Sequence, residues 1–346
     1  MNIVIAILIF GFIIIFHELG HFLTAKACGV RVNEFTLGLG PTLFSFGKGE
    51  TRYCLKLLPF GGSCVMEGED SESDDERAFN KKSIWQKFLI VFAGPLFNFL
   101  LAFILSVIMI GSAGFYAPTV SGTTAGYPAE QAGITAGDTI RQINGYPIHF
   151  YNEISIYTFF HKKKPLTIKY ERDGRIRTAR LKPRYDKITK RYLIGVRGGE
   201  LRSHPGPINT IAYGFYEIKY QIYVVIESLK ELILGHVSIN DMSGPVGIVK
   251  TIGDTYKSSL ADGIYYVVMN LINITILLTA NLGVMNLLPF PALDGGRLLI
   301  FIIEGISRKK IPEKVEEYIN GVGFVILMAL MVLIMGNDIR KLIVSR

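Results

Sequence analysis

The sequence predicts a polytopic α-helical membrane protein with a membrane-associated β-hairpin region and an inserted α+β soluble domain. Three observations predict it: long apolar runs, a glycine-interrupted β-type stretch between the first two runs, and a polar middle region with turn signals. Of the 346 residues, 49% are hydrophobic and the mean hydropathy is +0.34. Because a bilayer-spanning helix needs about 20 mostly apolar residues, the runs predict about four transmembrane helices.

The predicted spans are residues 3–28, 84–110, 264–288 and 319–335. The first run has no basic leader and no small-residue cleavage site, so it is interpreted as a retained span and not as a signal peptide. An even number of spans puts both termini on one side of the membrane.

Residues 32–66 alternate in the β manner between glycine pairs, which is typical of hairpins. We expect a small sheet here, packed on protein or lining a wet cavity, because lipid-exposed strand edges are not tolerated. The acidic run at residues 67–76 is interpreted as a solvated linker.

Residues 116–184 predict the soluble domain, with turns at Asn144-Gly145 and Asp173-Gly174 and a β run at 166–170. Residues 207–235 then carry apolar side chains in steps of three and four, which predicts an amphipathic helix. That helix either lies on the membrane or packs against the soluble domain.

The net charge is +8, with much of the positive charge between residues 162 and 191. No nucleic-acid motif accompanies it, so a basic face that meets anionic lipid or solvates the fold is favoured. Cys28, Cys54 and Cys64 lack CxxC spacing, which argues against a disulfide framework and a cysteine-only zinc site. Cys54 and Cys64 could face each other across a hairpin, but reduced, small apolar residues are the favoured interpretation.

Membrane orientation depends on short-loop charge. Residues 308–310 are Arg-Lys-Lys in a short loop and favour the cytoplasm, whereas the basic residues 340, 341 and 346 point the other way. The soluble domain is expected outside.

Residues 17–21, HELGH, form an HExxH motif on the first predicted span. Histidines four residues apart project from one helical face and can bind one Zn²⁺, while Glu18 can act as general base. The alternative is two histidines that are satisfied inside a helix bundle. Three ionisable groups at the end of a span favour the metal, since such groups are costly there unless used or paired.

A catalytic zinc needs a third protein ligand. Glu34 is the nearest acid, but it falls in the glycine-rich β region. Asp294 is the better candidate, because it ends the third span between prolines and glycines in residues 286–296, NLLPFPALDGG. Its alternative role is to cap the helix that starts near Gly295.

These motifs resemble the site-2 protease family of intramembrane zinc metalloproteases, in particular its bacterial RseP/RasP-type branch, over nearly the whole chain. Further matching segments are Gly94-Pro95 with Asn98, residues 58–62 (LPFGG) with Met66 and Gly68-Glu69, and residues 243–248 (SGPVGI). Residues 128–134, 137–140 and 143–145 resemble one PDZ domain. Residues 63–65, Ser-Cys-Val, depart from the pattern, since relatives often carry a large aromatic and a basic residue there, so substrate preference could differ.

The resemblance implies that His17, His21 and Asp294 bind zinc and that Glu18 is the base. It implies substrate contacts at Asn286 and, as an added strand, at the β-loop; the substrate-binding candidates are Asn286, Pro289, Leu55, Leu57, Gly61, Gly62 and Met66. Gly94 and Asn98 could equally serve close helix packing.

The implied domain order is a first span at 1–28, the β-loop and linker at 29–83, a second span at 84–112, a PDZ-like domain at 113–200, an amphipathic helix and connection at 201–262, a third span at 263–296, a cytoplasmic loop at 297–318, and a fourth span with its tail at 319–346.

The function so implied is intramembrane endoproteolysis of single-span proteins, such as anti-sigma factors or remnant signal peptides. The enzyme would lie in the bacterial inner membrane, with its active site near the cytoplasmic side and the PDZ-like domain outside as a size filter or peptide binder. Membrane lipid is an expected partner and nucleic acid is not; the oligomeric state is left open. Two alternatives are a non-catalytic membrane adaptor, against which an intact Glu18 argues, and a metal transporter, which would favour more charges within the spans.

Overall fold

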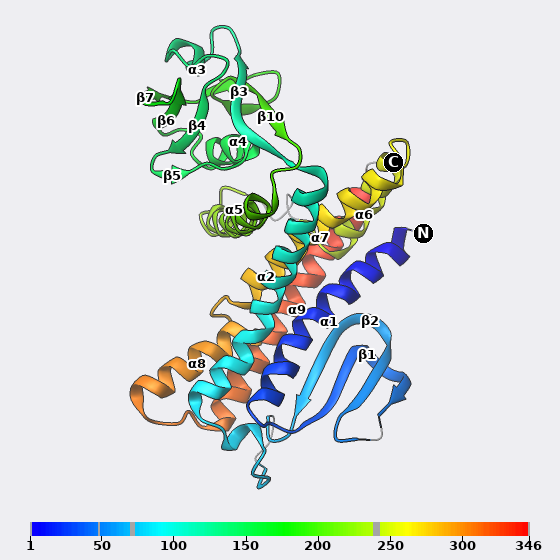
Figure 1. Ribbon diagram of the computed structural model, residues 1–346. Coiled ribbons are helices and arrows are strands. Elements are labelled where there is room, and N and C mark those ends of the chain that lie inside the picture. Colours follow the sequence, from blue (N-terminus) through cyan, green and yellow to red (C-terminus); the bar gives the residue numbers. More distant parts are fainter. Residues whose placement is uncertain (1, 48, 70–72, 238–242, 345–346) are drawn as a thin grey trace. The chain divides into compact units, whose positions relative to one another are not determined.

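The computed structural model describes residues 2–47, 49–69, 73–237 and 243–344 (Figure 1). The chain divides into two compact units, Met1–Leu105 with Gly235–Arg346, and Ser106–Leu234. We call them the membrane unit and the soluble unit and describe each by itself.

The membrane unit is mostly helical, and helix α2 continues from it into the soluble unit. Its long elements are α1 (Asn2–Ala27), α2 (Ile84–Ala113), α6 (Pro245–Leu260), α7 (Ile264–Asn286), α8 (Asp294–Ser307) and α9 (Glu313–Val344), with a short 3-10 turn at Phe79–Lys81. Four of these helices are long and apolar enough to cross a membrane, namely Ile3–Ala27, Ile84–Ala113, Ile264–Asn286 and Lys314–Lys341. The predicted number of candidate spans is confirmed.

Helix α6 of this unit was not anticipated, and α8 was anticipated only in its start near Gly295. Helix α6 lies in the segment expected to be a connection, and α8 fills much of the segment expected to be a loop at 297–318. Both are too short for a span, and α6 carries charges such as Lys250 and Asp254 that hide it from an apolar-run criterion. Helix α9 begins six residues before the expected start of the fourth span.

Many outward-facing side chains of the candidate spans are apolar. Examples are Leu8 on α1 and Leu333 on α9, which are 67% and 65% exposed. Apolar side chains turned outward along long helices are what a lipid environment accommodates.

A long hairpin of β1 (Val32–Phe46) and β2 (Arg52–Met66) folds back on itself in the membrane unit. Residues Glu34–Leu37 of β1 pair on one side with 52–55 and on the other with 62–65 of β2, and the second half of β1 pairs with the first half of β2. The first half of β2 is therefore paired on both sides. Residues 62–66 pair with β1 alone, so within the described residues they form an edge.

The described part of the acidic run is tied to the protein more than a solvated linker would be. Glu67 accepts a hydrogen bond from Asn33 at 2.8 Å, and Asp75 lies 3.4 Å from the Arg31 guanidinium. Residues 70–72 of the run lie outside the described residues. The three cysteines are free, and in the sheet Cys64 lies opposite Phe35 while Cys54 lies opposite Thr36 and Ser45.

The soluble unit is built on a six-stranded antiparallel sheet in the order β10-β3-β4-β6-β7, with β5 beside β4. Its elements are β3 (Phe115–Thr123), α3 (Pro128–Gln131), β4 (Thr139–Ile143), β5 (Tyr146–Pro147), α4 (Tyr151–Phe160), β6 (Leu166–Arg172), β7 (Arg175–Leu181), the β8 (Arg184–Asp186) and β9 (Arg191–Leu193) ribbon, β10 (Val196–Arg202) and α5 (Pro207–Ile233). The sheet extends to Arg202 because β10 returns to pair with β3.

Both predicted turns of this unit have the backbone conformation of tight hairpin turns. Asn144 and Gly145 have φ of 49° and 85°, and Asp173 and Gly174 have φ of 52° and 72°. Positive φ at both central residues suits a tight hairpin, so these pairs join β4 to β5 and β6 to β7. The strands and α4 enclose a core that includes Ile140, Ile143, Ile154, Leu166 and Ile168.

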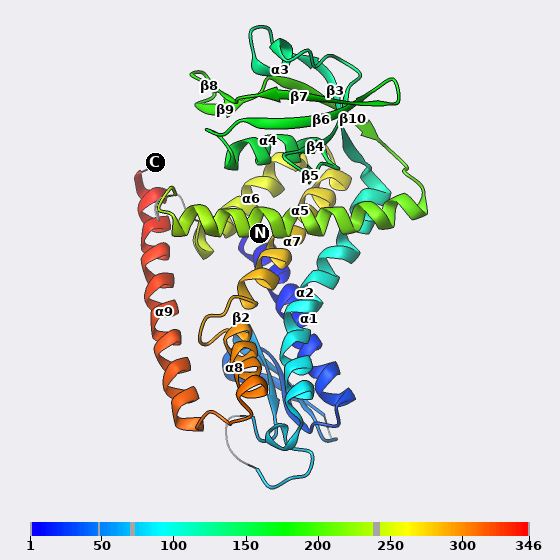
Figure 2. The same ribbon diagram turned by 90° about the vertical axis from the view of Figure 1, so that its left-hand side faces the viewer.

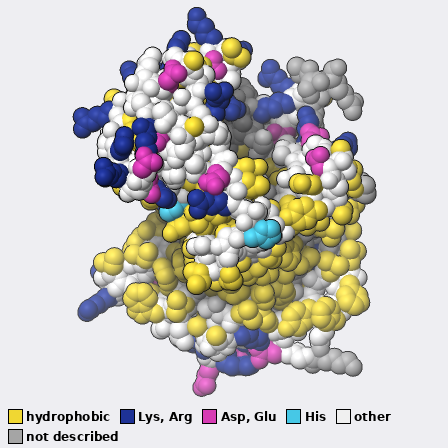
Figure 3. All heavy atoms as spheres, turned by 45° about the horizontal axis from the view of Figure 1, so that its top comes forward, with side chains coloured by type: hydrophobic (Ala, Val, Ile, Leu, Met, Phe, Trp, Pro, Cys, Tyr) yellow, Lys and Arg dark blue, Asp and Glu magenta, His cyan; other side chains and the backbone are white. Residues whose placement is uncertain are grey.

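Helix α5 lies alongside α4 in the soluble unit (Figure 2). Tyr213 of α5 stacks on Phe115, and Lys219 donates to the carbonyl of Pro147 at 3.1 Å. The opposite face exposes Ile208, Phe215 and Ile226. The helix was expected to pack on the soluble domain or lie on the membrane, and one of its faces packs on the domain. Figure 3 shows Lys and Arg side chains spread over the visible face of this unit.

Candidate metal centre and active site

Helices α1 and α2 approach closely where the HELGH motif lies. A Cβ added to Gly20 would meet the carbonyl oxygen of Ala93 at 2.3 Å, so only glycine permits this spacing. Small residues at a helix interface allow such backbone contact between spans. The contact brings His17 and His21 against α2.

Both imidazole rings are oriented by α2 through their Nδ1 atoms. His21 Nδ1 lies 2.9 Å from the carbonyl of Ile90, and His17 Nδ1 lies 3.0 Å from the side-chain amide of Asn98. Asn98 is fully buried and its carbonyl accepts a hydrogen bond from Thr279 of α7 at 3.1 Å. Anchoring Nδ1 leaves each Nε2 free to bind a metal, which is the usual arrangement of ligating histidines. The amide atom placed opposite Nδ1 of His17 is Nδ2 of Asn98. Ligation through Nε2 would put the proton on Nδ1, and the amide of Asn98 would then have to be turned over so that its oxygen accepts that proton.

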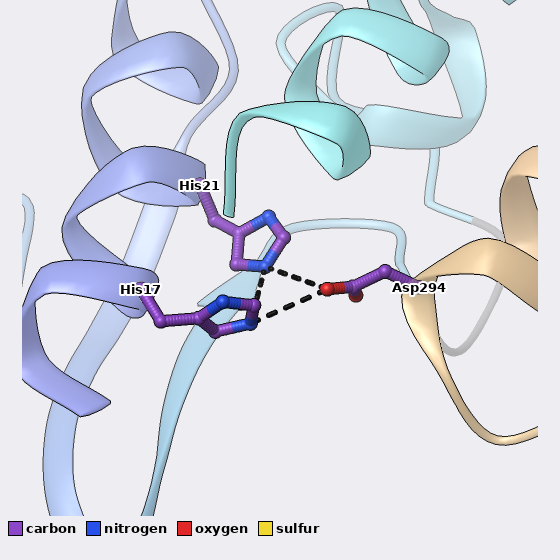
Figure 4. Close-up of side chains that lie close together, drawn as sticks. All are labelled: His17, His21 and Asp294. Atoms are coloured by element: carbon purple, nitrogen blue, oxygen red, sulfur yellow. Dashed lines mark hydrogen bonds and ion pairs between the residues drawn. The ribbon is translucent and has the colours of Figure 1, made fainter. Parts of the chain in front are cut away.

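The Asp294 carboxylate completes a three-residue cluster with the histidines (Figure 4). Its Oδ2 lies 3.3 Å from His17 Nε2 and 3.6 Å from His21 Nε2, and the two Nε2 atoms are 3.2 Å apart. This oxygen is buried and makes no hydrogen bond within the described residues. Two imidazole nitrogens and a carboxylate oxygen form a donor set that suits Zn²⁺, and a catalytic zinc has three such protein ligands.

A tightly packed turn between α7 and α8 carries Asp294, which is the first residue of α8. Cβ atoms added to Gly295 and Gly296 would meet the carbonyl oxygens of Leu288 and Phe290 at 2.2 and 2.4 Å. Gly323 of α9 packs as closely on Pro291. The non-helical segment is therefore in close contact with the start of α8 and with α9, while Pro289 and Ala292 are exposed.

Gly94 makes room for the two imidazoles. A Cβ at this position would lie 2.2 Å from His21 Nε2 and 2.8 Å from His17 Cε1. Gly94 and Asn98, one helical turn apart, thus both contact the histidines, beyond any role in helix packing.

A cavity of about 260 Å³ opens beside the cluster. Its walls come from α1, α2, α8 and the edge segment of β2; the lining residues are His17, Glu18, His21, Ser63, Cys64, Val65, Met66, Glu69, Val91, Asp294 and Arg297. Gly62 packs directly on Glu18, since an added Cβ would meet Glu18 Cγ at 2.8 Å. Glu18 therefore borders a space that also reaches His17, His21 and Asp294.

The other sequence-predicted residues lie at different distances from this cluster. Asn286 is next to it, with Nδ2 3.4 Å from His17 Nε2. Met66 lines the cavity, whereas Leu55, Leu57, Gly61 and Pro289 do not. Glu34 lies apart from the cluster and pairs with Lys56 at 3.1 Å.

Several residues near the cavity escaped the sequence reasoning. Arg297 follows Asp294 by three positions, a helical spacing that could have flagged it. Glu69 was noted only as part of a motif. The Ile90 carbonyl and Thr279 have no sequence signal, because their roles depend on how α1, α2 and α7 pack.

The chain matches the profile of Peptidase family M50 over residues 5–330. Helix α1 carries the HExxH motif, and Asp294 lies beside this motif although it is far from it in sequence. Together with these features, the match defines a zinc metalloendopeptidase of the site-2 protease type. The chain belongs to peptidase family M50.

Three relatives extend over nearly the full chain. A Clostridium acetobutylicum protein named "putative zinc metalloprotease" is 40% identical, covering 98% of this chain and 97% of that one. A Clostridium perfringens protein with the same description is 37% identical, covering 98% of each. The zinc metalloprotease RasP of Geobacillus kaustophilus is 31% identical, again covering 98% of each.

Proposed function

We propose that this enzyme cleaves the transmembrane segments of single-span membrane proteins, with anti-sigma factors and remnant signal peptides as the substrate classes. The observation that carries the proposal is the convergence of His17, His21 and Asp294 beside Glu18. The histidines and Glu18 lie on a helix that is apolar and long enough to span a membrane. A hydrolytic site on such a helix is suited to peptide bonds within a membrane, which other proteases cannot reach.

In the proposed reaction, His17, His21 and Asp294 would hold Zn²⁺, which when bound would supply Lewis-acid polarisation of the scissile carbonyl and of the attacking water. Glu18 takes the proton of the attacking water and delivers it to the leaving amide nitrogen. Asn98 and the Ile90 carbonyl keep the two imidazoles in the ligating orientation. Asn286, beside His17, is suited to hydrogen-bond the substrate near the scissile bond.

A transmembrane helix hides its carbonyls in its own hydrogen bonds, so the substrate must be extended before attack. The edge of β2 at residues 62–66 supports strand addition as the means. Its residues 63–66 line the cavity that contains Glu18 and the metal ligands. Leu55 is less suited to pair with substrate through its backbone, because β1 pairs with it on both sides.

The soluble unit is proposed to be a PDZ-like domain. Within this unit a cavity of about 260 Å³ lies between α4 and the start of β10; its lining residues include Ile154, Ser155, Thr158, Gly195, Val196 and Arg197. Such a cavity supports peptide binding, and the bulk of the domain supports exclusion of large ectodomains. We place this unit outside and residues 308–310 in the cytoplasm, in a bacterial inner membrane.

Co-expression with a tagged panel of single-span anti-sigma factors and signal peptides tests the proposal. Fragment sizes are compared by immunoblot for the wild type, Glu18→Gln, and the wild type with a zinc chelator. We expect fragments only with the untreated wild type. Equal fragments from the wild type and Glu18→Gln would overturn the mechanism. Cellular function that survives Glu18→Gln, without any cleavage, would instead support the adaptor hypothesis.

A further inference from the structure

The carboxylate of Glu69 joins two walls of the active-site cavity. Its Oε2 accepts a hydrogen bond from the backbone nitrogen of Met66, the last residue of β2, at 3.3 Å. Its Oε1 is ion-paired with the Arg297 guanidinium on α8. The Glu69 and Arg297 side chains are only 14% and 26% exposed. One side chain thus links the end of the β2 edge to the helix that begins at Asp294.

Both residues of the pair line the cavity beside the cluster of His17, His21 and Asp294. Arg297 follows Asp294 by three positions on α8, so the two side chains project from neighbouring positions on one helical face. Glu69 and Arg297 line the same cavity as His17, Glu18 and Asp294. An ion pair that is partly removed from water and backed by a backbone hydrogen bond is worth more than an exposed pair.

The two elements that the pair connects are each held firmly by other contacts. After β2, the backbone nitrogens of Phe79 and Asn80 donate to the carbonyls of Glu67 and Gly68 at 2.7 and 3.2 Å. At the start of α8, Gly296 packs against the Phe290 carbonyl too closely for any side chain. Loss of the pair should therefore allow the end of β2 to shift relative to the start of α8, while both elements stay folded.

We propose that Glu69 and Arg297 form a positioning pair that sets which substrate peptide bond meets the metal. This inference rests on the proposed function, in which substrate adds to the β2 edge. Successive residues of a strand are about 3.3 Å apart, so a shift of β2 against Asp294 by a fraction of that distance changes the bond presented. Misplacement by about 1 Å can cost on the order of 100-fold in rate.

The variants are Glu69→Gln, Arg297→Gln, Arg297→Lys and the charge exchange Glu69→Arg with Arg297→Glu. The matched control is Glu50→Gln, which removes an acid paired with Lys26 and Arg77 at 2.5 and 2.6 Å, away from the cavity lining. The purified full chains are assayed in detergent on a single-span segment that the wild type cuts. The readouts are zinc per chain, kcat, KM and the masses of both products.

We expect Glu69→Gln and Arg297→Gln to keep zinc, to lose about 10- to 100-fold in kcat with little change in KM, and to spread cleavage over neighbouring peptide bonds. Arg297→Lys and the charge exchange should recover a single cut. A structural role alone would lower the amount of active enzyme without moving the cut.

Unchanged rate and cut in Glu69→Gln, as in Glu50→Gln, would overturn the positioning role. So would a rate loss that follows zinc loss in proportion with the cut unmoved. A wild type that holds zinc but cuts no segment would remove the proposed function first and this inference with it.

Discussion

The side-chain amide of Asn98 lies 3.0 Å from Nδ1 of His17, 81 residues away in sequence. The contact joins α2 to His17, the first of the proposed metal ligands, and Thr279 of α7 donates to the Asn98 carbonyl. Fixing Nδ1 determines which ring nitrogen faces the proposed metal position, so the geometry of the proposed zinc site depends on a residue that would not touch the metal.

Removal of this amide should weaken zinc binding. We expect Asn98→Ala to lower zinc affinity about 10- to 100-fold, the usual effect of losing such a partner. Competition with a chromophoric chelator measures it. Ser106→Ala is the matched control, because Ser106 is also fully buried on α2 but its hydroxyl has no hydrogen-bond partner in the described structure. Equal affinities for the two variants would contradict the role of Asn98.

Gly94 is predicted to tolerate no side chain. The added Cβ of Gly94→Ala would lie 2.2 Å from His21 Nε2, so the imidazoles must move and the site should lose most of its zinc and activity. Gly11→Ala on α1 serves as control, since its Cβ would meet nothing within 4 Å. The measurement is zinc per chain by atomic absorption. Full zinc occupancy in Gly94→Ala would contradict the close approach of position 94 to the His21 imidazole.

Gly62 should matter to catalysis more than to metal binding. In Gly62→Ala the Cβ would meet Glu18 Cγ and Ile14 Cγ2 at 2.8 Å, which pushes the β2 edge away from α1. We expect zinc to be retained and kcat to fall about 10- to 100-fold as the added strand is misplaced. Gly49→Ala, with open space around its Cβ, should behave as wild type. A Gly62→Ala enzyme with wild-type kcat would argue against strand addition at this edge.

The soluble unit should loosen as pH rises. Burial raises the pKa of Glu217 on α5 to about 7, although a hydrogen bond from Gln221 lowers it in part. Because the folded pKa exceeds the unfolded value, stability is full below about pH 4.5 and is lost as pH rises through about 7, by on the order of 3 kcal/mol at most.

Hydrogen exchange of α5 amides in the intact chain tests this, after correction for intrinsic rates. Protection in the wild type should fall from pH 5 to pH 8, and Glu217→Gln should remove most of that change. Glu227→Gln, in the same helix and paired with Lys230, should keep it. The same pH dependence in both variants would assign the effect to another group.

Local patterns in the sequence predict the spans, the hairpin turns and the two histidines, because each depends on residues within a few positions of one another. Asp294 could be found although it is far from the histidines in sequence, because an acid between prolines and glycines at the end of a long apolar run is rare. The Glu69–Arg297 pair spans 228 positions and follows only from how β2 meets α8. Helix α6 was not anticipated, and neither was the extent of α8 beyond its start near Gly295, because a criterion built on long apolar runs does not detect short, partly polar helices.

The central claim is that His17, His21 and Asp294 hold zinc while Glu18 serves as the base. It is tested most directly by measuring, in purified Glu18→Gln, both zinc per chain and the cleavage rate of a single-span segment that the wild type cuts. We predict wild-type zinc content with a rate about 100- to 10,000-fold lower. Wild-type cleavage by Glu18→Gln, or zinc loss as severe as in His17→Ala, would contradict the account.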